Sequence, residues 1–332
     1  QAIKNAATQR SKAAKRLTAD ARFLLTGTPM ENHLGELWNL MDFLNPGLLG
    51  SAENFQERFA IPIERDGNRA ARSGLKRLVA PFILRRTKAQ VLTELPLRTE
   101  TTLRIQPSDE EAALYEAVRM RAIEKLAEAA DGKPKPLQIL GEIMRLRRAC
   151  CHPKLVLAES TIEGSKLAQV LETIDELRSG HHRALVFSQF VDHLQLVREQ
   201  LDQRGITYQY LDGSTPARAR KQSVDAFQAG EGEVFLISLR AGGTGLNLTA
   251  ADYVIHLDPW WNPAVEDQAS DRAHRIGQQR PVTIYRMVLA GTIEEKILEL
   301  HATKRGLAES LLEGTDRSGK LTTDELLQLI KP

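Results

Sequence analysis

The second half of the chain alternates short apolar runs with longer amphipathic segments. Runs rich in branched and aromatic residues predict strands at "RALVFSQF", "ITYQYLDG", "EVFLISL", "YVIHLD" and "VTIYRMVL". Apolar positions at helical spacing predict helices over residues 191–204, 216–229, 263–275 and 292–312. Strict alternation of strands and helices is typical of a parallel sheet that helices cover on both faces. We therefore expect residues 165–312 to form one doubly wound α/β domain, with ligands at the carboxyl ends of its strands.

The first half has a mainly helical pattern. Helices are predicted over residues 1–22, 31–44 and 108–131, through "LGEIMRLRRAC", and over most of the basic region 51–95. Ser108 and Glu111 form the sequence pattern of a capping box at the start of one of them. Only residues 23–25 and the alternating stretch "TETTLRIQ" are typical of strands. This half therefore has too little predicted sheet to be a complete α/β domain.

Length and composition limit the class of protein. A chain of 332 residues is longer than one hydrophobic core normally organises, so two or more domains are expected. No stretch approaches the roughly 18 apolar residues of a membrane span, and the N-terminus lacks the apolar segment of a secretory signal. The only cysteines, Cys150 and Cys151, are adjacent, which favours a reducing compartment. We expect an intracellular protein, cytoplasmic or nucleoid-associated in a bacterium and nuclear in a eukaryote, with no membrane partner.

Positive charge is concentrated in one region of the sequence. The net charge is only +2, but residues 65–98 hold nine lysines and arginines against two acidic residues, a local balance of +7. Arg85, Arg86 and Lys88 lie within this region. It predicts a surface that faces phosphates, with an ordinary solvated basic face as the alternative.

The strongest chemical signal lies between residues 235 and 276. The glycine-rich turn in "ISLRAGGTGLN" follows a predicted strand, where backbone N–H groups can approach a phosphate closely. Further along, Gln268, Arg272 and Arg275 have the spacing of one helical face. Paired guanidinium groups suit a transferring γ-phosphoryl group. The alternatives are a plain left-handed glycine turn and ordinary exposed arginines.

A zinc site at Cys150, Cys151 and His152 is not expected. Vicinal cysteines without a second ligand pair give poor tetrahedral geometry, so no metal site is predicted.

Seven blocks then make the signal specific. In order they are "LLTGTPMEN", "FILRRTK", "LRRACCHPKLV", "ALVFSQF", "LDGST", "RAGGTGLNLTAADYVIHLDPWWNP" and "DQASDRAHRIGQ". With these blocks the chain resembles the Swi/Snf-type DNA-dependent ATPases of helicase superfamily two over nearly its whole length. In that family two RecA-like lobes close on ATP and track along duplex DNA, with helical protrusions between them.

The resemblance implies a division of the chain. Residues 1–50 would be the C-terminal remnant of the first RecA-like lobe. Residues 51–164 would be mainly helical protrusions and linker, with a return strand of the first lobe near residues 99–106. Residues 165–312 would be the complete second lobe, and residues 313–332 a C-terminal turn and helix.

The resemblance also implies roles for single residues. Arg272 and Arg275 would be arginine fingers supported by Gln268, while Gly245 and Asn247 would face the nucleotide. The expected coupling residues between the ATP site and DNA are Thr26, Gly27 and Thr28. The expected DNA contacts are Ser188, Gln189, Gly242, Gly243, Thr244 and Trp260, together with the basic Arg85, Arg86 and Lys88. Trp260 could instead be packing, which is the role expected of Trp261.

Two parts of an ATPase of this type are missing from the sequence. The near match to a phosphate loop, Gly314 to Lys320, is followed by Leu321 where a hydroxyl would hold Mg²⁺, so it is interpreted as a flexible turn. The opening "QAIKN" resembles the stretch after the family's Mg²⁺-binding acidic box. We therefore expect the C-terminal part of a larger ATPase that is inactive alone.

The parent protein is predicted to be an ATP-dependent translocase or remodeller on double-stranded DNA, with ATP and Mg²⁺ as cofactors. Its expected partners are duplex DNA, DNA-bound proteins and the missing part of the first lobe. Two alternatives remain: a non-catalytic lobe that serves as a scaffold for DNA or protein, and an RNA-directed helicase of superfamily two.

Overall fold

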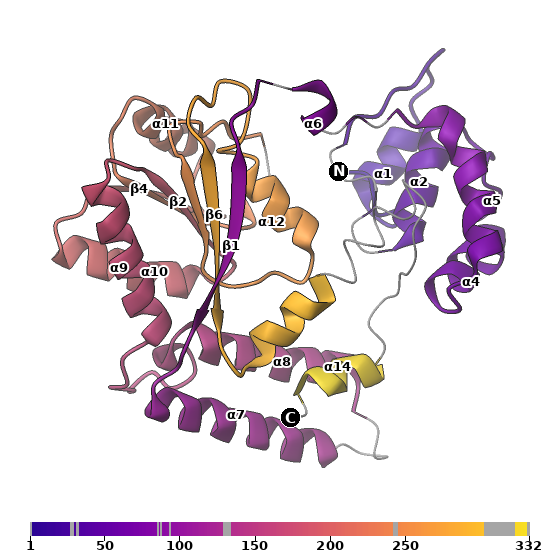
Figure 1. The fold of residues 1–332 in the computed structure, drawn as a ribbon. Helices are drawn as coiled ribbons and strands as arrows, with labels where there is room; N and C mark the ends of the chain where they lie inside the picture. The colour runs from indigo at the N-terminus through magenta and orange to yellow at the C-terminus, as the bar shows by residue number, and fades with distance from the viewer. Residues whose placement is uncertain are drawn as a thin grey trace. The chain divides into compact units, whose positions relative to one another are not determined.

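The structure is a computed structural model, drawn in Figure 1. It describes residues 2–26, 30, 33–84, 86, 88–92, 94–128, 134–241, 245–301 and 323–330. These divide into two compact units. The helical unit comprises the described residues up to 91 with 262–264 and 300–301, and the sheet unit comprises those of 92–261, 265–299 and 323–330.

The described part of the helical unit contains helices and no strand. Its helices are α1 (Gln9–Lys15), α2 (Leu34–Leu44), α3 (Ala52–Phe55), α4 (Ile61–Glu64), α5 (Arg69–Val79) and α6 (Lys88–Val91), with a π-helical turn at Gln56–Ala60 and a 3₁₀ turn at Ala80–Phe82. The apolar face of α2, with Leu34, Leu37 and Met41, packs against Phe55 and Leu75. The helical spacing of these residues in the sequence therefore corresponds to a buried face.

The strand expected at residues 23–25 does not form. Residues 21–26 have no regular structure, and Phe23 and Leu25 expose 89% and 96% of their surface. A strand needs a neighbour to accept and donate its backbone hydrogen bonds, and the described residues of this unit provide none.

The sheet unit is built on six parallel strands. They are β1 (Arg98–Ile105), β2 (Ala184–Ser188), β3 (Tyr208–Leu211), β4 (Val234–Ser238), β5 (Tyr253–His256) and β6 (Val282–Leu289), in the spatial order β1-β6-β5-β2-β4-β3. Every residue of β2 and β4 is buried, as in a strand covered on both faces. The predicted doubly wound parallel sheet is confirmed.

Helices cover both faces of this sheet (Figure 1). On one face, α11 (Ala217–Gln228) and α12 (Pro263–Ser270) contribute Phe227 and Ala269 to a core with Phe187 and Ile237 of the strands. On the other face, α9 (Ser165–Ser179) packs against β1 and β6, and α10 (Val191–Gln203) packs against β2 and β4. Residues 293–301 form a further helix.

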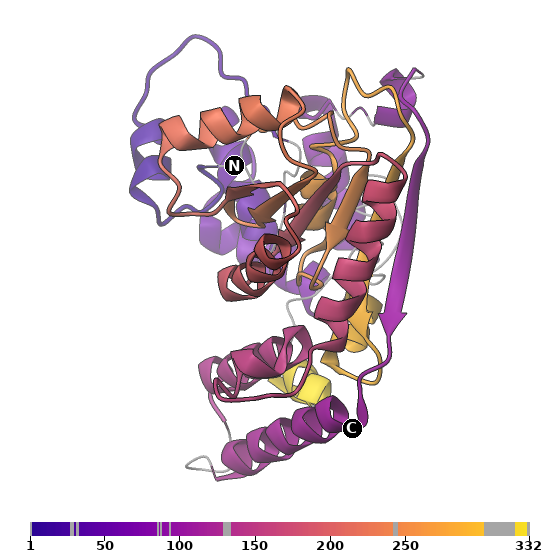
Figure 2. The ribbon, with the colours of Figure 1, turned by 90° about the vertical axis from the view of Figure 1, so that its left-hand side faces the viewer.

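A helical hairpin extends from one end of the sheet, where α7 (Asp109–Ala127) and α8 (Pro136–Cys151) lie side by side in Figures 1 and 2. The capping box expected at its start is present, because Ser108 accepts from the amide of Glu111 and the Glu111 carboxylate accepts from the amide of Ser108. The C-terminal helix α14 (Thr323–Ile330) packs on α8 and α7. Arg119 of α7 donates a hydrogen bond to the carbonyl of Ile330 at 3.2 Å.

The strand expected to return to the first lobe near residues 99–106 lies elsewhere. It is β1, which pairs in parallel with β6 along its whole length, from Arg98 opposite Val282 to Ile105 opposite Leu289. Because β6 would otherwise expose an unpaired edge, β1 completes the sheet of the 165–312 region.

Among the helices that the structure describes, none has the length and apolar character needed to span a bilayer.

Candidate functional site

Several expected site residues lie outside the described part of the chain. They are Gly27, Thr28, Arg85, Gly242, Gly243 and Thr244, and the phosphate-loop-like stretch from Gly314 to Lys320 also lies there. Of the described ones, Thr26, Arg86 and Lys88 belong to the helical unit. The sheet unit holds the remainder: Ser188, Gln189, Gly245, Asn247, Trp260, Gln268, Arg272 and Arg275.

The carboxyl ends of β2 and β5 are joined by a buried polar contact. The hydroxyl of Ser188 donates a hydrogen bond to the carboxylate of Asp258, which lies two residues beyond β5. The backbone amide of Gln189 donates to the same carboxylate at 3.3 Å. Ser188 is only 1% exposed, so its hydroxyl is not available to a DNA phosphate. The expected DNA contact through this side chain does not fit the structure, because Asp258 already uses the hydroxyl.

Arg147 of α8 holds this contact from the other side. Its fully buried guanidinium donates to the side-chain oxygen of Gln189 at 3.0 Å and to the carbonyl of Pro259 at 2.5 Å, and it lies 3.8 Å from the Asp258 carboxylate. Burial raises the pKa of Asp258, while Arg147 and the Ser188 hydroxyl oppose that rise. The two opposite charges thus lie in a low-dielectric site, where each offsets the cost of burying the other.

Aromatic rings surround the same guanidinium. Its carbon lies 5.6 Å from the ring centre of Phe190, 5.8 Å from that of Trp260 and 5.2 Å from that of Trp261. Trp260 is partly exposed and also packs against the sheet core. Both tryptophans therefore have a packing role, and for Trp260 this leaves part of its surface accessible.

Arg147 and Asp258 belong to none of the residue sets that the sequence predicts for the site. Arg147 stands in "LRRACCHP", but the sequence gives no sign of which arginine of the block is buried. Asp258 follows a predicted strand directly, which is the position where polar residues of a doubly wound sheet meet ligands, so that signal was present.

The segment that follows the glycine-rich turn, residues 245–248, contacts the segment that carries Arg272 and Arg275. Arg275 donates from Nη1 to the carbonyl of Leu246 at 3.3 Å, and the amide of Leu248 donates to the carbonyl of Arg272 at 3.0 Å. Gly245 adopts a left-handed φ of 58°, a conformation that glycine allows. Gly245 and Asn247 are both exposed beside this junction.

The expected single helical face of Gln268, Arg272 and Arg275 is wrong. The helix α12 ends at Ser270, and residues 271–277 form turns. The carbonyl of Arg272 accepts from the amide of Leu248 at 3.0 Å instead of continuing a helix. Gln268 lies on α12, whereas the two arginines lie on what we call the arginine turn, residues 271–277.

Arg272 has a buried side-chain donor that the described residues leave without an acceptor. It is half-buried, and burial lowers its pKa, with the nearby charge of Arg275 adding to that effect. Its buried Nε has no hydrogen-bond partner among the described residues. A buried donor without an acceptor is costly, and the oxygen of a phosphate would satisfy it. The chemistry of this turn therefore fits the phosphates of ATP.

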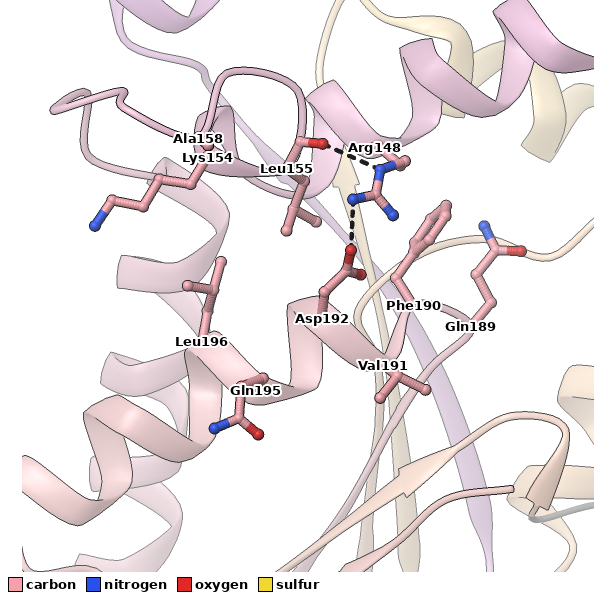
Figure 3. Close-up of a pocket in the computed structure, with 10 residues that line it drawn as sticks. All are labelled: Arg148, Lys154, Leu155, Ala158, Gln189, Phe190, Val191, Asp192, Gln195 and Leu196. Atoms are coloured by element: carbon pink, nitrogen blue, oxygen red, sulfur yellow. Dashed lines mark hydrogen bonds and ion pairs between the residues drawn. The ribbon is translucent and has the colours of Figure 1, made fainter. Parts of the chain in front are cut away.

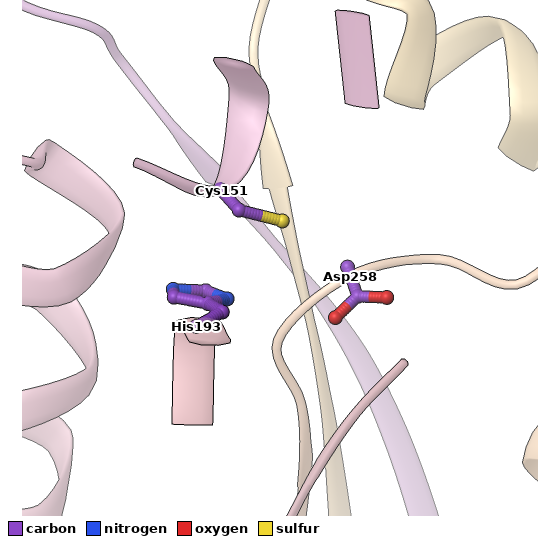
Figure 4. Close-up of side chains that lie close together, drawn as sticks. All are labelled: Cys151, His193 and Asp258. Carbon is purple, nitrogen blue, oxygen red and sulfur yellow. The ribbon is translucent and has the colours of Figure 1, made fainter. Parts of the chain in front are cut away.

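The side chains of Cys151, His193 and Asp258 lie close together (Figure 4). The three side chains are buried, and their ligand atoms lie within 4.8 Å of one another. Burial keeps His193 neutral by lowering its pKa, and both of its ring nitrogens lack a partner among the described residues. The Asp258 oxygens already accept from Ser188 and Gln189, and Arg147 adds a positive charge nearby. This donor set does not fit a resident cation.

A hollow of about 790 Å³ opens beside the N-terminus of α10 (Figure 3). Arg148 forms one wall through a 2.5 Å ion pair with Asp192 and a 3.1 Å hydrogen bond to the carbonyl of Leu155. Lys154 and Gln189 also line it. Gln189 thus connects this hollow to the buried Arg147.

Comparisons with known proteins identify the family to which the chain is similar. Residues 1–155 match the model of the SNF2-related domain, and residues 165–277 match that of the helicase conserved C-terminal domain. A putative ATP-dependent helicase/translocase, YwqA of Bacillus subtilis, is 40% identical over 99% of this chain and 36% of its own length. An uncharacterized ATP-dependent helicase of Mycoplasma pneumoniae is 37% identical over 100% of this chain and 32% of its own. The chain thus spans about a third of the length of these relatives.

Solved structures give the same result. The SWI2/SNF2 ATPase core of Sulfolobus solfataricus in complex with double-stranded DNA is 34% identical, with a TM-score of 0.58 over 99% of this chain and 71% of that one. The C-terminal part of the Fun30 ATPase domain, at 21% identity and a TM-score of 0.58, shares the fold over 71% of this chain. The chain, with its RecA-like sheet unit, belongs to the SWI2/SNF2 family of ATPases.

Proposed function

We propose that this chain is the C-terminal part of an ATP-dependent translocase or remodeller that acts on double-stranded DNA. The observation that carries the proposal is the junction of the arginine turn with the glycine-rich segment, where Arg272 keeps a buried donor without a partner among the described residues. The family, and a relative solved as a complex with double-stranded DNA, support the choice of reaction and substrate.

In this proposal the arginine turn acts on ATP. Arg272 and Arg275 donate hydrogen bonds to the γ-phosphate and stabilise the charge that develops as it is transferred. Gly245 and Asn247 face the nucleotide, and Gln268 supports the arginines from the end of α12. Mg²⁺ bound with ATP supplies charge neutralisation at the phosphates, and we assign none of its ligands to this chain.

DNA is contacted from both units in this proposal. In the sheet unit the contacts are the side chain of Gln189, the exposed part of Trp260, and the backbone of Gly242, Gly243 and Thr244. In the helical unit the contacts are Arg85, Arg86 and Lys88, of which Arg86 is exposed and Lys88 partly buried. Thr26, Gly27 and Thr28 couple the binding of ATP to that of DNA. Ser188 contributes indirectly, because it fixes Asp258 and thereby the start of α10.

The division of the chain that we propose keeps residues 1–50 as part of the first lobe and residues 51–91 as a helical protrusion. The helices α7 and α8 form a second protrusion on the sheet unit. The chain lacks a sequence match to the phosphate loop with its hydroxyl residue, so we propose that it does not hydrolyse ATP by itself.

The test compares ATP hydrolysis by the purified chain with hydrolysis by the full-length protein that carries it. The proposal predicts no DNA-stimulated turnover by the chain alone, and stimulation of the full-length protein by duplex DNA above that by single strands or RNA. Turnover by the chain alone would show that no essential part is missing. Preferential stimulation by RNA would support an RNA-directed helicase, and no turnover by the full-length protein would support a scaffold lobe.

The basic region has its own test. Binding of the chain to duplex DNA is measured as a function of salt, because each phosphate contact contributes to the slope. Charge reversal at Arg86, alone and together with Arg85, should flatten that slope. The control is the opposite charge reversal, Glu163→Lys, at an exposed loop residue. It should leave the slope unchanged or make it steeper. An unaltered slope in the Arg86→Glu variant would remove this region from the DNA-binding surface.

A further inference from the structure

The segment that leads into β1 contacts the arginine turn directly. The ring of His274, which lies inside the turn, is bonded through Nε2 to the carbonyl of Pro96 at 2.8 Å. A carbonyl only accepts, so Nε2 carries the proton and donates it. His274 is buried, which makes this contact a fixed part of the turn.

Arg98, two residues after Pro96, contacts one carboxylate on α12 and one at the start of the arginine turn. Its Nη1 donates to Asp271 at 3.2 Å, and its Nη2 lies 3.3 Å from Asp267. Asp267 precedes Gln268, and Asp271 precedes Arg272. One planar guanidinium therefore spans the end of α12 and the start of the arginine turn, a geometry that the single ammonium of a lysine cannot reproduce.

A second guanidinium extends the network to the base of α12. Arg286 of β6 donates to Glu100 at 2.6 Å and to Glu266 at 2.8 Å, and the backbone amide of Trp260 donates to Glu266 at 2.7 Å. Glu100 also accepts from Arg98 at 2.5 Å. Exposed ion pairs contribute little, but here the side chains of Arg98 and Arg286 are only 22% and 8% exposed and share their carboxylates.

The residues of this network from 96 to 100 lie just after the first stretch of the helical unit in the chain. Residue 91 ends the first stretch of the helical unit, and residues 96–100 are the first part of the sheet unit that bonds to the arginine turn. The segment that follows the first stretch of the helical unit is thus bonded, at the start of β1, to the turn that carries Arg272 and Arg275.

We propose that Arg98 is a positioning residue for ATP hydrolysis, which fixes the arginine turn through Asp267 and Asp271 so that turnover depends on the placement of β1. This inference rests on the proposed function. A small displacement of a catalytic group costs turnover much more than substrate binding, because positioning matters most in the transition state.

The test measures DNA-stimulated ATP hydrolysis by the full-length protein with the substitution Arg98→Ala. We expect kcat to fall about tenfold or more, with KM for ATP and duplex DNA affinity within about twofold of the wild type. Arg98→Lys should restore turnover only in part. The matched control is Arg104→Ala on the same strand, whose ion pair with Glu295 at 3.3 Å is exposed and away from the turn. It should retain the wild-type kcat.

A second variant separates positioning from folding. Asp271→Asn removes the charge of one partner, and the double variant with Arg98→Ala should lose no more turnover than Arg98→Ala alone, because both remove the same contact. Thermal unfolding of each variant shows whether it is folded at the assay temperature. If Arg98→Ala does not fold, the kcat of the Asp271→Asn variant decides.

The outcomes distinguish the two proposals. If Arg275→Ala loses turnover while Arg98→Ala and Asp271→Asn keep the wild-type kcat, the positioning role is wrong and the arginine fingers stand. If Arg275→Ala and Arg272→Ala both keep the wild-type kcat, the arginine-finger assignment itself is wrong. The positioning role would also be wrong if Arg98→Ala lowered kcat/KM only by raising KM, with kcat unchanged.

Discussion

The guanidinium of Arg147 lies 3.8 Å from the carboxylate of Asp258, and both side chains are almost completely buried. The pair joins α8 to the loop after β5, and through Gln189 it also reaches the end of β2. A buried charge without its partner is strongly unfavourable, so this contact should be sensitive to the loss of either member.

Replacing Arg147 by Met should therefore destabilise the chain by about 3–5 kcal/mol, because Asp258 would remain buried without its counter-charge. Urea unfolding followed by circular dichroism measures the loss. Arg145→Met, at a partly exposed position on the same helix, is the control and should change stability by about 0.5 kcal/mol or less. The double variant Arg147→Met with Asp258→Asn should be more stable than Arg147→Met alone. An additive loss in the double variant would mean that the two charges are not coupled.

Acid should weaken the network at the start of β1. Burial opposes ionisation of Glu100, but the charges of Arg286 and Arg98 outweigh it and lower its pKa from 4.5 to about 2. A carboxyl group whose pKa is lowered by folding stabilises the fold above its unfolded pKa, and that contribution is lost as the pH falls through its folded pKa. The stability difference between the wild type and Glu100→Gln should hence shrink between about pH 4.5 and pH 2.

The urea midpoints of the wild type and of Glu100→Gln are measured across this pH range, and their difference is compared at each pH. Glu163→Gln, at an exposed loop position, serves as the control and should show a smaller pH-dependent difference. If the difference for Glu100→Gln stayed constant down to pH 2, the ion pairs with Arg286 and Arg98 would not form in solution.

The two cysteines should be unreactive in the folded chain. Both are buried, and burial raises the pKa of each thiol above its ordinary value. Because the thiolate is the nucleophile, a maleimide should label neither Cys150 nor Cys151 in native buffer on a timescale that labels both in urea. Mass spectrometry of the labelled peptide gives the result. Rapid labelling in native buffer would show that the end of α8 opens readily.

The sequence predicts the features that depend on local pattern. The fully buried runs of β2 and β4 and the amphipathic segments between them are sufficient for a doubly wound sheet, and the capping box at Ser108 uses residues within one helical turn.

Features that depend on partners far away in the chain cannot be predicted from local sequence pattern. The partner of β1 is β6, almost two hundred residues away, and an alternating strand pattern does not specify which sheet it joins. The helix α12 ends at Ser270, and beyond it the carbonyl of Arg272 bonds to the amide of Leu248 in a distant segment, which a local helical spacing does not reveal. The hydrogen bond of Ser188 likewise goes to the distant Asp258, and a polar residue at a strand end does not by itself reveal such a partner.

The central claim is that the arginine turn stabilises the transferring phosphoryl group, and one measurement tests it most directly. Single-turnover hydrolysis of ATP by the full-length protein on duplex DNA is compared for the wild type, Arg275→Ala and the control Arg280→Ala, whose side chain is 56% exposed and paired with Asp252. The account predicts a loss of about 10³-fold for Arg275→Ala and little change for Arg280→Ala. A wild-type rate for Arg275→Ala, with duplex DNA binding intact, would contradict it.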